Sequence, residues 1–159
     1  MTRLKKVSLA RRRLLQASGS VLTLAATLGL GLLPARARAG TSRPAFEART
    51  QAAALQQLGA ESALESPDIF IKAPQLSENG AFVPLEVTSN IPGTSSISVL
   101  VEKNRYPLIA TFRFGVGVEA FVSTRIKMAE TSAVRAVVQA DGKFYTAATE
   151  VMVILGGCG

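Results

Sequence analysis

The stretch SAVRAVVQADGKFYTAATEVMVIL, residues 132–155, indicates the fold class. Two runs rich in β-branched and small apolar residues, 132–140 and 144–155, flank Asp141-Gly142. An Asp-Gly pair between two such runs is a strong signal for a two-residue hairpin turn, because both residues adopt positive φ at low cost. We therefore expect two antiparallel strands that meet at this turn.

Further short runs upstream have the same period of two, and turn signals separate them. The predicted strands are 69–72, 82–87, 97–102, 110–114 and 120–126, and the turn signals are Asn79-Gly80, Ile91-Pro92-Gly93 and Asn104-Arg105-Tyr106-Pro107. About seven short strands at intervals of about ten residues predict an all-β fold, an immunoglobulin-like antiparallel β-sandwich.

The core of this sandwich is expected from the apolar residues that alternate along the runs. They are Val83, Leu85, Val87, Ile97, Val99, Phe112, Phe114, Val122, Ile126, Val137, Val151, Val153 and Leu155. Met128 and Met152 are interpreted as core or interface fillers, and Tyr106 and Phe144 as possible subunit-interface aromatics.

One amphipathic helix is predicted ahead of the strands, over Arg43–Gly59. Pro44 suits its first turn, Gly59 suits its end, and the alanines favour helix. The expected layout is an N-terminal helix and linker over 40–67 and the sandwich domain over 68–155.

The first 39 residues have the order of a secretory signal. A basic segment precedes an apolar stretch, Leu14–Leu33, and Ala37-x-Ala39 offers the small side chains that a signal peptidase requires. Arg11-Arg12 opens the stretch RRRLL, which resembles the twin-arginine pattern. We expect a twin-arginine-type signal peptide over 1–39, a periplasmic mature protein and no membrane contact after cleavage; the alternative is an uncleaved membrane anchor.

Positive charge is concentrated in this signal. Residues 1–39 hold eight of the 18 basic residues and no acid, which leaves ten basic residues against all eleven acids in 40–159, a net charge near −1. Nucleic-acid binding therefore loses its main electrostatic argument. The chain has no histidine, which excludes an imidazole general base and a histidine metal site. No catalytic residue, metal ligand or bound cofactor is expected.

Cys158 is the only cysteine, so an internal disulfide is excluded. Gly156 and Gly157 precede it and Gly159 follows. Glycine loses the most conformational entropy on ordering, so 156–159 is expected to form a flexible arm. Four extended residues reach about 13 Å, enough to hold a thiol clear of the domain. An exposed free thiol is a liability in an oxidising compartment, which favours a function for this one over a chance position.

The ending Gly-Gly-Cys-Gly on an exported β-rich domain resembles the SoxY family, the carrier subunits of the periplasmic Sox thiosulfate-oxidation system. Matching segments extend over roughly residues 44–159. They are Ala73-Pro74 with Glu78-Asn79-Gly80-Ala81, then Val83–Val87, Val101–Asn104 with Pro107-Leu108, Thr124–Met128 and Asp141–Lys143.

This resemblance implies a covalent carrier that performs no catalysis itself. Sulfur intermediates derived from thiosulfate would be attached to Cys158. A SoxZ-type subunit would form a heterodimer with the chain. The SoxXA cytochrome would couple thiosulfate oxidatively to the thiol, the SoxB hydrolase would release sulfate, and a sulfane dehydrogenase, where present, would oxidise the remaining sulfur.

The sequence departs from the family pattern in two places. The family usually ends Gly-Gly-Cys-Gly-Gly, whereas this sequence ends at Gly159, and Met152-Val153-Ile154 is more apolar than the usual last strand. A terminal carboxylate one residue from the sulfur is expected to raise the pKa of the Cys158 thiol, because negative charge disfavours the thiolate.

Two other functions remain open at this stage. The chain could be a non-catalytic periplasmic adaptor that uses Cys158 only for an intermolecular disulfide. It could also be an enzyme with Cys158 as nucleophile, but a mobile thiol without a histidine lacks a general base.

Five basic residues also allow two interpretations. Lys103, Arg105, Arg113, Arg125 and Lys127 could form a surface for anionic sulfur adducts or an acidic partner, or lie on solvated faces balanced by Glu86, Glu102, Glu119 and Glu130. The near-neutral charge favours solvated faces.

An unpaired sheet edge is also expected to contact the partner subunit.

Overall fold

The structure, a computed structural model, describes residues 43–154. These residues belong to one compact unit, Gly40–Gly159. Among them, no helix is both long and apolar enough to cross a membrane.

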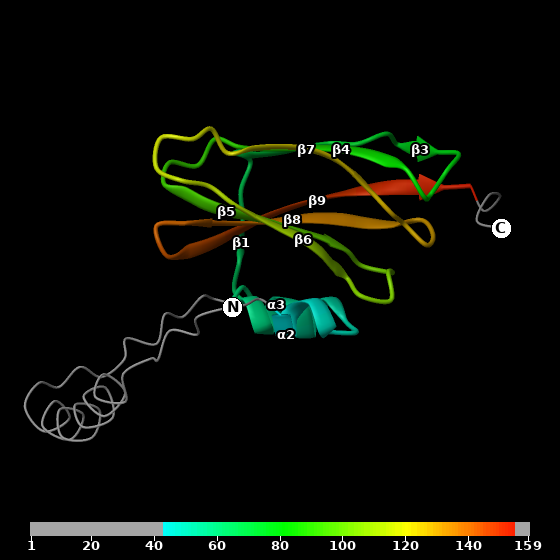
Figure 1. Cartoon of the computed structure of the whole chain (residues 1–159), viewed down its shortest axis with the longest axis horizontal. Coiled ribbons are helices and arrows are strands. Elements are labelled where there is room, and N and C mark those ends of the chain that lie inside the picture. The colour runs from blue at the N-terminus through cyan, green and yellow to red at the C-terminus, as the bar shows by residue number, and fades with distance from the viewer. Residues whose placement is uncertain (1–42, 155–159) are drawn as a thin grey trace, which may run out of the picture. The chain divides into compact units, whose positions relative to one another are not determined.

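Two β-sheets pack face to face, and two short helices lie against the outer side of the larger one (Figure 1). The six-stranded sheet has the order β1 (Leu64–Glu65), β9 (Lys143–Val153), β8 (Ser132–Ala140), β5 (Thr94–Val101) and β6 (Leu108–Arg113), with β3 (Leu76–Ser77) also beside β9. The three-stranded sheet has the order β2 (Ile69–Lys72), β4 (Val83–Ser89) and β7 (Phe121–Ile126). The predicted all-β sandwich is confirmed.

The hairpin that indicated the fold class forms as predicted. β8 and β9 pair antiparallel from Ala140↔Lys143 to Ser132↔Val151. Asp141 has φ 47° and Gly142 has φ 75°, so both turn residues occupy the left-handed region that a two-residue hairpin requires.

The helical segment differs from the prediction of one helix over Arg43–Gly59. It forms two, α2 (Arg43–Glu47) and α3 (Gln51–Leu58). Thr50 causes the break: its backbone is extended, with φ −130° and ψ 152°, and its hydroxyl accepts a hydrogen bond from the Ala53 amide at 3.2 Å. A threonine that caps a new helix cannot also continue the previous one. The predicted end at Gly59 is confirmed, since Gly59 is the left-handed C-cap of α3.

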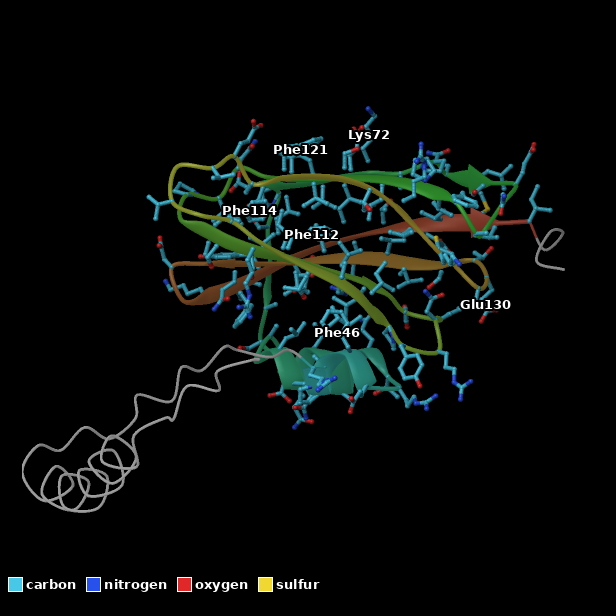
Figure 2. The ribbon with its side chains drawn as sticks, viewed as in Figure 1. Phe46, Lys72, Phe112, Phe114, Phe121 and Glu130 are labelled. Carbon is cyan, nitrogen blue, oxygen red and sulfur yellow. The ribbon has the colours of Figure 1, made fainter. Side chains whose placement is uncertain are left out.

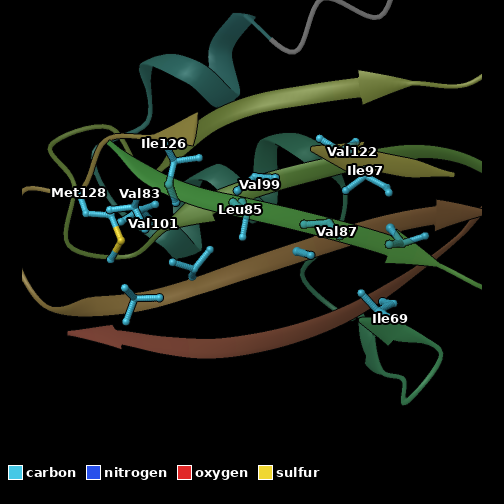
Figure 3. Close-up of a cluster of buried hydrophobic side chains, with 14 of the residues drawn as sticks. Ile69, Val83, Leu85, Val87, Ile97, Val99, Val101, Val122, Ile126 and Met128 are labelled. Carbon is cyan, nitrogen blue, oxygen red and sulfur yellow. The ribbon is translucent and has the colours of Figure 1, made fainter. Parts of the chain in front are cut away.

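The apolar side chains form two clusters, one on each side of the large sheet. The main cluster lies between the sheets and is drawn in Figure 3. The second lies between the large sheet and the helices, and its buried members are Ala45, Ala54, Ala60, Leu100, Leu108 and Val137. The middle of the sheet is therefore buried on both faces, which explains why the end of β5 is buried at every position rather than at alternate ones.

Most of the predicted core residues are confirmed in the main cluster. Phe112, Phe114 and Val153 are only partly buried against it, and Val137 belongs to the cluster beneath the helices. Leu155 lies outside the described residues. Met128 is buried in the core, whereas Met152 is half exposed and is not a core residue.

The sheets are antiparallel apart from two short pairings on the outer edge of β9. β1 and β3 both run parallel to it, with Leu64 beside Tyr145 and Leu76 beside Met152. The segment 40–67, expected to hold only the helix and a linker, thus also contributes β1 to the large sheet.

The Asn79-Gly80 turn serves a second purpose besides reversing the chain. The Asn79 side-chain oxygen accepts a hydrogen bond from the Ala81 amide at 2.8 Å, as in an Asx turn. The Gly80 carbonyl accepts a hydrogen bond from the Met128 amide at 2.8 Å. A Cβ at Gly80 would collide with the Met128 carbonyl oxygen and reach Val153 Cγ1 at 3.0 Å. Glycine is required here by close approach, which anchors the 78–82 loop to the β7–β8 loop.

Replacing Gly80 with alanine is expected to destabilise the protein by about 1–3 kcal/mol, because the new methyl group forces backbone apart. Gly115→Ala is the matched control. A Cβ at Gly115 meets only Val118 Cγ2 at 3.9 Å, so its effect should stay within about 0.5 kcal/mol. Urea denaturation followed by circular dichroism measures both. Equal stability of the two variants would contradict the close approach.

Truncation of Leu100, which is fully buried between the large sheet and the helices, tests the second cluster. Leu100→Ala should cost about 2–5 kcal/mol, because it leaves a cavity there. Leu64→Ala removes the same atoms from a side chain that is 63% exposed and should cost less than about 0.5 kcal/mol. A small effect of Leu100→Ala would mean that the helices do not cover this face in solution.

Candidate functional site

The residues predicted to carry the chemistry lie outside the described part of the chain. These are Cys158, its neighbours Gly156, Gly157 and Gly159, and the signal residues Arg11 and Arg12. The last described residue is Ile154, four positions before Cys158. Chain geometry alone limits Cys158 to within about 13 Å of Ile154. The end of β9 therefore defines the neighbourhood in which Cys158 lies.

Hydrogen bonds hold the end of β9 on both sides. On the β3 side, the Met152 amide donates to the Gln75 carbonyl at 2.9 Å and the Ile154 amide donates to the Ser77 carbonyl at 3.0 Å. On the opposite side, the Val153 amide donates to the Thr131 hydroxyl at 2.9 Å. The segment that leads to Cys158 thus leaves from a fixed position in the large sheet.

Exposed apolar side chains gather at this end of β9. Leu76 and Met152 are neighbours on paired strands, both about half exposed, and Ile154 is exposed two residues further on. Phe82 is also exposed. It is the last residue of the 78–82 loop, directly before β4. Water-exposed apolar groups that lie together are typical of a surface that other molecules contact.

The structure brings together some of the five predicted basic residues. The Asn104 side chain bonds the Lys127 carbonyl at 2.8 Å and the Ala129 amide at 3.0 Å, so the β5–β6 loop with Lys103 and Arg105 lies against the β7–β8 loop. Glu102 and Glu130 belong to the same two loops, which leaves mixed charge at this end.

The other two basic residues lie on strands. Arg125 is on β7, beside Pro84, and lines a small groove with Asn104 and Lys127. Arg113 is at the far end of β6, beside Ser96. Because Arg113 lies apart, the five residues do not form one continuous basic surface.

The two aromatic residues considered for an interface have different environments. Tyr106 is partly exposed, and the Arg49 guanidinium lies over its ring at 4.3 Å from the centroid. Phe144 packs against the cluster beneath the helices, beside Gly59. Phe144 is thus an internal packing residue.

Another groove lies at the opposite end of β9. It measures about 680 Å³ and is formed by the β4–β5 loop, Ser89–Ser95, and the β6–β7 loop, Phe114–Ala120. Gly93 in this groove approaches Asp141 of the β8–β9 hairpin, where β9 begins. Within residues 43–154, no group of three or more histidine, cysteine, aspartate or glutamate side chains is placed to hold a metal ion.

Sequence reasoning missed the residues that fix and surround the end of β9. Asn104 was identified only as part of a turn, Thr131 was not singled out, and Leu76 was not placed in a strand, because β3 has only two residues and shows no periodicity. The only signal for Thr131 in the sequence was that it is a polar residue that interrupts an apolar pattern next to a turn.

Solved structures resemble this fold. The sulfur carrier protein SoxY from Chlorobium limicola f thiosulfatophilum is 43% identical, with a TM-score of 0.54, over 60% of this chain and 88% of that chain. A superoxide reductase (neelaredoxin) from Ignicoccus hospitalis is 14% identical, with a TM-score of 0.50, over 66% of this chain and 93% of its own. The second likeness concerns the fold alone.

A search of curated proteins gave no match. The family model for "Sulfur oxidation protein SoxY" matches residues 55–158, which is most of the chain and includes Cys158. Together with the 43% identity to a SoxY structure, this match shows that the chain belongs to the SoxY family.

Proposed function

We propose that this protein is a carrier that holds thiosulfate-derived sulfur covalently on Cys158 and presents it in turn to partner enzymes. The observation that carries the proposal is the family match, which extends through residue 158 in a chain with a single cysteine. The solved relative is itself named a sulfur carrier protein. In this function the chain is a cargo-bearing subunit, it is not an enzyme, and it needs no bound cofactor besides the sulfur adduct.

The anchored end of β9 supports this function physically. A carrier needs a rigid body and a reactive group on a short tether, so that the group can enter the active sites of different enzymes. The bonds from Met152, Val153 and Ile154 fix the body up to four residues before the thiol. The remaining reach of about 13 Å suits entry into an enzyme cleft without unfolding of the domain.

In this proposal, three reactions act in turn on the sulfur carried by Cys158. The thiol sulfur forms a bond to the sulfane sulfur of thiosulfate, and the thiol proton and two electrons leave. The electrons pass to the SoxXA cytochrome. Water then cleaves the bond to the sulfonate group in the SoxB hydrolase, which releases sulfate and leaves a persulfide on Cys158. A sulfane dehydrogenase, where present, oxidises that persulfide sulfur.

The proposal also includes a compartment and a stable partner. Export by the twin-arginine route through Arg11-Arg12 would place the mature chain in the periplasm, as a heterodimer with a SoxZ-type subunit. Export in the folded state would allow the heterodimer to assemble before it crosses the membrane.

Intact-protein mass spectrometry tests the covalent adduct. Mature chain is purified without reductant from the periplasm of cells given thiosulfate, next to a Cys158→Ser variant. The wild type should gain masses equal to a thiosulfate moiety and to one additional sulfur atom, and the variant should gain neither. Both additions should disappear after treatment with dithiothreitol, because thiols cleave sulfur–sulfur bonds.

A different result would identify the alternative function. Wild-type protein that carries only a bare thiol or a disulfide-linked dimer, in cells whose thiosulfate oxidation is active, would contradict the carrier. That outcome would favour the adaptor that uses Cys158 for an intermolecular disulfide.

Replacement of the two signal arginines tests the export route. Arg11→Lys combined with Arg12→Lys should leave precursor in the cytoplasm, because the twin-arginine route reads the pair as arginines. Arg36→Lys combined with Arg38→Lys, which makes the same chemical change near the cleavage site, should leave export unchanged. Immunoblots of periplasmic and cytoplasmic fractions measure both, and normal export of the first variant would exclude this route.

A further inference from the structure

β7 is a regular strand with one unpaired edge. The Ser89 amide donates to the Ala120 carbonyl at 2.9 Å, which fixes residues 120, 122, 124 and 126 as those whose backbone groups face β4. Phe121, Ser123 and Arg125 therefore direct their backbone groups outward. The Phe121 amide bonds Glu119. In the part of the chain that the structure describes, the remaining outward amide and carbonyl groups of β7 have no hydrogen-bonding partner.

The other sheet edges are less suited to pairing. β6 is interrupted by a bulge opposite Val99 and Leu100, and a bulge bends an edge away from a flat partner. β2 has four residues and lies between Pro67 and Pro74, and β1 has two residues. β7 has six residues in unbroken register with β4. An exposed edge of this kind is a template for a strand of another chain.

A groove runs along the same edge, in the seam between the two sheets. It measures about 230 Å³, and its lining is half apolar (Val99, Ile109, Ala110 and Ile126) and half polar (Asn104, Thr124, Arg125 and Lys127). A strand added to β7 would continue the small sheet across this seam, and its alternate side chains would point into the groove. The apolar part of this lining would accept an apolar side chain from the added strand.

The outer face of the small sheet supplies the other contacts. Phe70, Thr88 and Phe121 lie in one row across β2, β4 and β7, and the two phenylalanines are 54% and 46% exposed. Phe121 and Lys72 both project from this face, away from the large sheet (Figure 2).

The two cationic side chains on this face differ in whether an acid is paired with them. Lys72 is paired with Glu86 at 3.0 Å. Arg125 has no ion pair among residues 43–154. A carboxylate on an incoming strand would complement Arg125, and an apolar residue would cover Phe121.

We propose that β7 is the docking edge for an extended strand of the partner subunit, which carries apolar side chains toward the groove and a carboxylate opposite Arg125. A second copy of this chain is the alternative occupant, because Glu119, two residues before β7, would lie opposite Arg125 in an antiparallel pair of β7 strands. The proposal rests on the proposed function only in taking a SoxZ-type subunit as that partner, and it does not involve Cys158.

Amide exchange measured by NMR locates the contact. The mature chain is compared alone and in the purified complex with a co-expressed SoxZ-type subunit. The amides of Ser123 and Arg125 should exchange at least about tenfold more slowly in the complex, because they become hydrogen-bonded. Thr111 is the internal control: the Phe114–Ser95 hydrogen bond at 2.9 Å fixes the alternation that turns its amide outward on β6, so it should be unchanged.

Charge reversal tests the carboxylate. Arg125→Glu should weaken binding of the SoxZ-type subunit by at least about tenfold, because like charges would then face each other. Lys143→Glu makes the same change on an exposed residue at the β8–β9 hairpin and should leave the dissociation constant unchanged. Calorimetric titration measures both affinities, and unfolding curves of the free variants verify that each is folded.

The outcomes separate the two proposals. A complex that forms while Ser123 and Arg125 exchange as in the free chain overturns the β7 edge and leaves the heterodimer intact. Self-association with Ser123 protection and no subunit binding overturns the choice of partner. If no complex forms, both the β7 docking edge and the choice of a SoxZ-type partner are wrong. The carrier function is tested separately, by the mass that the intact protein gains on Cys158.

Discussion

The pairing of β9 on both of its edges is the constraint on which the rest of the structure depends. Every residue of β8 has a register partner in β9 on one side. On the other side, β1 lies beside its beginning and β3 beside its end. A terminal strand held on one edge only would fray, since chain ends open at little cost in free energy. Here β9 is an inner strand, so its end is held by neighbours on both sides.

The proposed docking edge and the end of β9 belong to different sheets but are joined by one short loop. β7 ends at Ile126, and the loop that follows includes Met128, which bonds Gly80, and Thr131, which bonds Val153. A strand added to β7 would therefore lie to the side of the position from which the last residues leave.

Much of the sandwich could be predicted from the sequence, because long strands such as β4 and β7 carry a period of two and the Asp141-Gly142 turn requires positive φ. The two-residue strands β1 and β3 could not, since they have no period and pair with residues far along the chain. The break at Thr50 was missed because capping by a hydroxyl competes with helix continuation. Of the proposed site, the sequence singled out Cys158, but not the residues that anchor the end of β9.

Because residues 40–159 have almost no net charge, recognition by other proteins must depend on short-range contacts. With a charge near −1 over residues 40–159, the body of the carrier produces little long-range steering, so encounters with enzymes gain little from electrostatics. Exposed Leu76, Met152 and Ile154 beside the end of β9 instead offer a small apolar contact area. Small interfaces are typical of transient complexes, in which fast release matters as much as binding. Under the proposed function, in which the carrier leaves each enzyme with altered cargo, such a surface would allow fast release, and the stable contact with the partner subunit would lie on the separate β7 edge.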